Sequence, residues 1–179
     1  MINTSKRSKD ILSSRKIELY EKNANVIDFW RKNPCIAAED LFGVRLLDAQ
    51  KYILNQSWNT QYNLWCASRN FGKTFLADIF IALKWALFEN QQIYIIGSTG
   101  SQSIQAFKKL EDMAMQRIQS CKTLTDVFAN ETKKSSSCHT GFIHNPSSHS
   151  VFSYNESGVF TLNGDPNNNR SRRASLVFF

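Results

Sequence analysis

The sequence predicts an α/β fold in which a mainly parallel sheet is flanked by helices, because strand and helix patterns alternate along its second half. Residues 93–96 form an unbroken apolar run, which is typical of a parallel strand buried on both faces. Residues 74–88 form a helix pattern that is apolar on most sides, so this helix is expected inside the domain. Apolar residues recur at helical spacing again over residues 104–118.

Shorter strand patterns complete the expected sheet. Residues 64–67 are a brief apolar run that is expected to form the strand before the buried helix. Residues 151–154 and 159–162 alternate as two short strands, with a hairpin expected around residues 156–158. Residues 174–179 repeat the buried-strand pattern at the end of the chain.

The chain opens with a polar helical pattern that Pro34 ends, because proline disfavours helical geometry in the residue before it. A short second helix is expected to end at Gly43. A third helix pattern contains Gln50. We therefore divide the chain into a helical lead with a basic arm, residues 1–44, and a core, residues 45–179.

The composition favours a polyanionic partner and predicts no membrane segment. The formal net charge of the 179 residues is +7, and such an excess attracts polyanions. The apolar runs fall well short of the roughly 20 residues that cross a bilayer, and no apolar stretch follows the basic N-terminus, so a cytosolic protein is expected. The N-terminal arm is equally compatible with a solvated tail. Basic residues gather near both ends of the chain, at Lys6, Arg7, Lys9, Arg15 and Lys16 and at Arg170, Arg172 and Arg173.

The cysteines and histidines are considered as metal ligands and then set aside. Cys138, His139, His144 and His149 are close in sequence and are residue types that bind zinc. The usual close pair of cysteines is missing, and residues 130–149 are rich in serine and asparagine, so a polar loop is the better interpretation. None of the four cysteines forms a CxxC pair, which predicts free thiols.

The residues that carry chemistry are Gly72, Lys73 and Thr74, between the expected strand and the buried helix. This is the context of a phosphate-binding Walker A loop, whose backbone N–H groups surround the phosphates. Gly72 lets the backbone approach, Lys73 places positive charge on the β- and γ-phosphates, and the Thr74 hydroxyl can ligate Mg²⁺. The alternative is an ordinary helix N-terminus with a surface lysine.

Two further positions bear on this loop. Ala67 stands where the usual pattern has its first glycine, and alanine takes positive φ less freely. Arg69 lies four residues before Lys73, so its guanidinium could stabilise charge on the γ-phosphate from within the same subunit. An arginine that points to solvent is the alternative.

The segment WCASRNFGKTFLADIF resembles the Walker A loop of large terminase subunits, the ATPases that package DNA in tailed phages. That family has arginine at the position of Arg69 and lacks the first glycine, so Ala67 fits its pattern. Ser171 stands where the family often has glycine. The resemblance covers residues 26–179, and three flanking segments follow the family's order: LFGVRLLDAQKYIL, IYIIGSTGSQSIQAFKKLEDM and NGDPNNNRSRRASLVFF.

The resemblance implies a P-loop NTPase of the ASCE or RecA-like type, with ATP and Mg²⁺ as cofactors. It implies catalytic roles for Arg69 and Lys73, Mg²⁺ ligation by the Thr74 hydroxyl and an adenine contact for Gln50. The nucleotide would be bound by Gln50, Ser68, Arg69, Asn70, Phe71, Gly72, Lys73 and Thr74. Separately from the resemblance, the positive charge of the cluster makes Arg170, Arg172 and Arg173 candidate DNA contacts.

The resemblance also implies partners and a place of action. Family members drive double-stranded DNA into a procapsid as a homo-oligomeric ring on a portal protein, together with a small terminase subunit. This occurs in the host cytoplasm, without a membrane.

The family's acidic Walker B pair directly follows a strand like residues 176–179, and this chain ends at Phe179. The resemblance therefore implies an incomplete terminase without its nuclease domain, with impaired ATP turnover and, because of its apolar final strand, a tendency to aggregate. Two alternatives stay open: a helicase-like P-loop ATPase, and a non-catalytic nucleic-acid-binding fragment.

Overall fold

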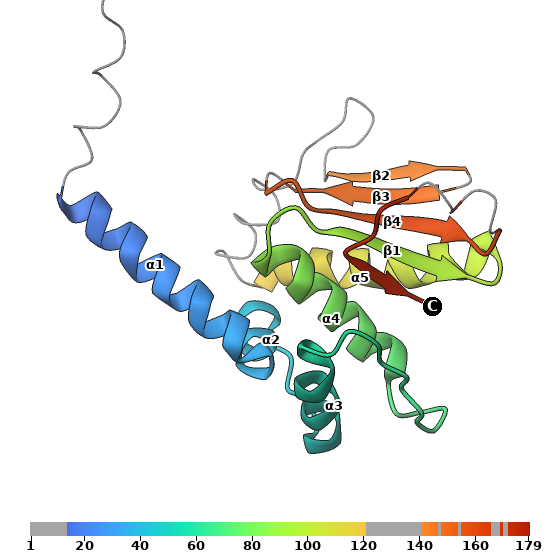
Figure 1. Ribbon diagram of the computed structural model, residues 1–179, viewed down its shortest axis with the longest axis horizontal. Helices are drawn as coiled ribbons and strands as arrows, with labels where there is room; N and C mark the ends of the chain where they lie inside the picture. Colours follow the sequence, from blue (N-terminus) through green and yellow to red (C-terminus); the bar gives the residue numbers. More distant parts are fainter. Residues whose placement is uncertain (1–13, 121–140, 147, 154, 166–168, 170–171) are drawn as a thin grey trace, which may run out of the picture.

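Helices lead into a sheet that occupies the second half of the chain (Figure 1). The computed structural model describes residues 14–120, 141–146, 148–153, 155–165, 169 and 172–179, without the side chains of residues 14–16, 20 and 113–120. The elements are, in order, α1 (Ser14–Lys32), α2 (Pro34–Phe42), α3 (Asp48–Trp58), α4 (Lys73–Leu87), β1 (Gln92–Gly97), α5 (Gly100–Ser120), β2 (Phe142–Asn145), β3 (Ser148–Phe152), β4 (Gly158–Asn163) and β5 (Leu176–Phe178).

The strands form one mixed sheet in the order β2-β3-β4-β1-β5 (Figure 1). β1 runs parallel to both of its neighbours, with Ile93 opposite Val159 of β4 and Leu176 of β5. β3 pairs antiparallel with both β2 and β4, as the expected hairpin around residues 156–158 requires. The prediction of a mainly parallel sheet is therefore right for β4, β1 and β5 only. Short connections join β2 to β3 and β3 to β4, and strands joined in this way pair antiparallel.

The core lies between the sheet and helices α4 and α5. α5 packs against β1, β3 and β4, and α4 packs against α5. The apolar pattern of α4 is confirmed, since Leu76, Ile79 and Leu83 are fully buried. Burying each such side chain contributes about 1.5–3 kcal/mol, so α4 is held mainly by packing.

Helices α1 and α2 belong to the predicted lead, residues 1–44, and α1 projects away from the sheet (Figure 1). The break after α1 and the end of α2 are as predicted: Pro34 opens α2, and Gly43 ends it with a left-handed φ of 58°. Most apolar residues of α1 are exposed, Phe29 among them, so they do not anchor the helix. α1 is held at its C-terminal end, where Arg31 Nε donates to the carbonyl oxygen of Leu87 at 2.7 Å.

Two expectations about the later strands are wrong. Residues 142–145 and 148–149, which were expected in a loop, belong to β2 and β3, because Phe142 and Val151 alternate with polar residues and bury one face against α5. The strand expected from residue 151 onward is confirmed over residues 151–152. Residues 130–140 of that expected loop lie outside the described residues. β5 is a short edge strand and not a buried one, and Phe179 beyond it is 87 % exposed.

No helix within the described ranges combines the length and apolarity needed to cross a membrane.

Candidate nucleotide-binding site

The candidate loop, residues 67–74, follows an extended segment that is not part of the sheet. Residues 64–67 pair with no strand in the described part of the chain, so the strand predicted there is wrong. Trp65 holds the segment instead: its Nε1 donates to Ser57 Oγ at 2.7 Å, and its ring lies edge-on to Phe80 and Phe178. Side-chain packing, not backbone pairing, therefore fixes the entry into the loop.

Lys73 begins α4 and closes the candidate loop on itself. Its Nζ donates to the carbonyl oxygens of Ala67 at 2.6 Å and Ser68 at 2.8 Å. Gly72, directly before it, has a left-handed φ of 84°, which a residue with a Cβ adopts at a cost of about 1–2 kcal/mol. A bound phosphate would compete with the two carbonyls for the ammonium group.

Backbone N–H groups at the start of α4 are open to an anion. Those of Lys73, Thr74 and Phe75 donate to no residue that the structure describes, and no side chain caps the helix. The first N–H groups of a helix have no intrahelical acceptor and lie at the positive end of its dipole. Their arrangement beside an ammonium group suits a phosphate.

Gln50 ties α3 to the candidate loop. Its side chain is buried, Nε2 donates to the carbonyl oxygen of Phe71 at 3.0 Å, and Oε1 accepts from the N–H of Leu47 at 3.1 Å. A Cβ on Gly72 would lie 3.2 Å from Gln50 Nε2, so glycine also permits this close approach. The observed role of Gln50 is to position the loop backbone, and its contact with adenine stays a prediction.

The other predicted residues differ in exposure. Arg69, Asn70 and Thr74 are exposed, whereas Phe71 is half-buried and packs against the core. Within the described ranges Arg69 makes no hydrogen bond or ion pair, so its side chain is available to a ligand. The structure thus places the loop backbone, Lys73 and Thr74 next to one another, whereas the Arg69 side chain forms no hydrogen bond or ion pair with them.

A cavity of about 810 Å³ lies beside the loop, at the carboxyl ends of the parallel strands. Thr74 lines it from α4, Gly97 from the end of β1 and Phe178 from the end of β5. Ser98 and Lys109 add polar groups to the lining. Ligands of open α/β sheets bind in this position, outside the carboxyl ends of the strands.

Asp78 lies one turn beyond Thr74 in α4 and is 3 % exposed. Burial raises the pKa of its carboxyl to about 7, and the positive charge of Lys109 opposes that rise. Sequence patterns pointed to neither Asp78 nor Lys109. The signal available for Asp78 was a single carboxylate among the apolar positions of a buried helix.

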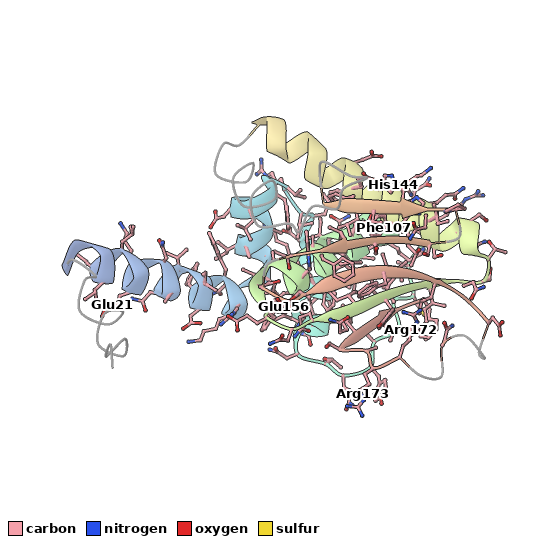
Figure 2. The ribbon with its side chains drawn as sticks, turned by 90° about the horizontal axis from the view of Figure 1, so that it is seen from above. Glu21, Phe107, His144, Glu156, Arg172 and Arg173 are labelled. Carbon is pink, nitrogen blue, oxygen red and sulfur yellow. The ribbon has the colours of Figure 1, made fainter. Side chains whose placement is uncertain are left out.

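The predicted DNA-contacting arginines lie partly within the described chain. Arg172 and Arg173 are exposed (Figure 2), and the Arg172 guanidinium carbon lies 5.9 Å from the centre of the Tyr94 ring. Arg170 lies outside the described residues. DNA contact by these arginines stays a prediction.

The structure describes some of the predicted free cysteines and some of the residues that were considered as zinc ligands. Cys35 and Cys66 are free thiols, while Cys121, Cys138 and His139 lie outside the described residues.

The two remaining histidines lie opposite each other in the register of β2 and β3. His144 Nε2 lies 2.9 Å from Glu111 Oε2, and the rings of His144 and His149 lie 4.6 Å apart. Among the described residues no group of three or more histidine, cysteine, aspartate or glutamate side chains is arranged to hold a metal ion. For Mg²⁺ delivered with a nucleotide, the Thr74 hydroxyl fits as a single protein ligand, because Mg²⁺ takes further oxygens from phosphates and water.

The sequence matches no protein-family model, and no curated protein is significantly similar to it.

Proposed function

We propose that this chain binds ATP with Mg²⁺ through the candidate loop and is the ATPase part of a DNA-packaging motor of the large-terminase type. One observation carries the nucleotide half of the proposal: the Lys73 ammonium sits in a loop whose following N–H groups have no acceptor in the described chain. An ammonium group beside open N–H groups is suited to a polyphosphate. The mixed α/β sheet with a cavity at its strand ends is compatible with a P-loop fold.

Each residue of the loop has a distinct role in the proposal. Lys73 leaves the carbonyl oxygens of Ala67 and Ser68 and binds the β- and γ-phosphates. Thr74 ligates Mg²⁺ through its hydroxyl. Arg69, which is exposed and uncommitted within the described chain, stabilises negative charge on the γ-phosphate.

Calorimetric titration with ATP and Mg²⁺ tests this proposal on the full chain. We expect Lys73→Ala to weaken binding about tenfold or more, because it removes a charge-assisted contact to the phosphates. Lys22→Ala is the matched control, since Lys22 is an exposed lysine of α1, and it should bind like the unaltered protein. Equal affinities of the two variants, or no binding by the unaltered chain, would refute the proposed site.

The motor half of the proposal rests on the resemblance to large terminases. It includes double-stranded DNA, a portal protein, a small terminase subunit and an assembling procapsid as partners. The two exposed arginines Arg172 and Arg173 are compatible with DNA contact. Salt-sensitive DNA binding that ignores both ATP and Lys73→Ala would instead favour a non-catalytic nucleic-acid-binding protein.

A further inference from the structure

Lys109 of α5 reaches the same cavity as the last residue of the candidate loop. Thr74 lines this cavity from the first turn of α4, and Lys109 lines it from the facing helix. α4 and α5 pack directly against each other, which fixes the position of the Lys109 backbone relative to the loop. The Lys109 side chain itself is exposed, so its ammonium can move on its four-carbon stem.

The Lys109 charge also acts on a buried carboxyl of α4. Residues four apart share one face of a helix, so Asp78 lies on the same side of α4 as Thr74. Asp78 is buried, and the positive charge of Lys109 favours its ionised form. The position of Lys109 in the cavity lining, opposite Thr74, is what brings its ammonium group to the space beside the phosphate loop.

We propose that Lys109 is a second cation of the phosphate site and binds a polyphosphate that enters the cavity. The inference rests on the proposed function and adds a residue and a ligand class to it: a di- or triphosphate chain whose terminal groups extend past Thr74. Such a chain carries several negative charges, so it attracts the ammonium group that lines the cavity opposite Thr74.

The test compares neighbouring lysines of one helix. Wild type and the variants Lys109→Gln, Lys109→Arg and Lys108→Gln are titrated calorimetrically with ATP and with inorganic tripolyphosphate, each with Mg²⁺. Lys108 is also exposed but does not line the cavity, which makes it the matched control. Thermal denaturation checks that each variant is folded.

We expect Lys109→Gln to weaken binding of both ligands about fivefold, as for a partly solvent-screened charge pair. Lys109→Arg should keep most of the affinity, and Lys108→Gln should leave it unchanged.

The outcomes separate this inference from the proposed function. If Lys73→Ala loses binding while Lys109→Gln and Lys108→Gln bind alike, the role of Lys109 is overturned and the nucleotide site stands. If Lys73→Ala has no effect, the nucleotide site itself fails and the inference falls with it.

Discussion

The two ends of the parallel strands satisfy their polar groups in opposite ways. At the amino ends of β1 and β4, Asn155 Nδ2 donates to the carbonyl oxygens of Trp85 and Phe88 at 3.1 and 3.2 Å, and Ser157 Oγ donates to Phe88 at 2.9 Å. The N–H of Gln91 donates in turn to Ser157 Oγ at 3.0 Å. These bonds close the C-terminal end of α4 against the turn between β3 and β4.

At the carboxyl ends the chain leaves donors open. The N–H groups that begin α4 have no acceptor in the described chain. The Lys73 ammonium group donates to a carbonyl oxygen of its own loop, and a cavity lies between Thr74 and Lys109. Buried polar groups cost free energy unless they are paired, so a protein keeps unpaired donors only where solvent or a ligand can reach them. One end of α4 is therefore closed by paired polar groups, whereas the other leaves donors available, as the proposed nucleotide site requires.

The largest effect on stability is expected at the closed end. Asn155→Ala leaves the carbonyl oxygens of Trp85 and Phe88 without this donor and should lower the free energy of unfolding by about 3 kcal/mol. Urea denaturation measures the change. Asn145→Ala, at an exposed position of β2, is the control and should change stability by less than about 0.5 kcal/mol. Similar losses in both variants would mean that the network at Asn155 is not structural.

A substitution at Asp78 should stabilise the protein, and the gain should depend on pH. The folded-state pKa of about 7 exceeds the unfolded value of 3.8, so the folded state binds the proton more tightly and stability falls as pH rises from 3.8 through 7. Asp78→Asn removes this loss and should raise the free energy of unfolding by about 2 kcal/mol at pH 8, with a smaller gain near pH 4.

Urea denaturation across that pH range measures the effect of Asp78→Asn. Asp112→Asn, at an exposed position of α5, should lack this pH-dependent gain. A gain of equal size at pH 4 and pH 8 would contradict the explanation by buried charge.

The smallest effect is expected where α3 meets the candidate loop. Gln50→Ala removes the donor to the Phe71 carbonyl oxygen and should cost about 1 kcal/mol, since solvent can reach the loop and replace the bond. Amide hydrogen exchange should become faster in residues 68–75, whereas Gln56→Ala, exposed in the same helix, should not change it. Unchanged exchange in both variants would show that Gln50 does not hold the loop.

Local signals along the sequence predicted several elements well. The left-handed Gly43 ends α2, the apolar pattern of α4 is buried, and the apolar run of residues 93–96 lies within β1. The Gly72-Lys73-Thr74 motif was found from its residue types, and the helix does begin at Lys73. These features depend on neighbours in the chain, so a pattern of residue types contains them.

Only the tertiary structure decided which distant groups meet. The extended segment around Trp65 carried a strand pattern, yet it is held by rings from α4 and β5 and not by a ladder. The hydrogen bond from Gln50 to Phe71 and the closure of α4 by the bond from Asn155 to Trp85 join residues 21 and 70 positions apart. The sequence by itself determined the helices, the central strand and the lysine that begins α4, because backbone geometry and apolar periodicity act locally. Packing decided the surroundings of that lysine, because burial and charge are properties of the folded chain.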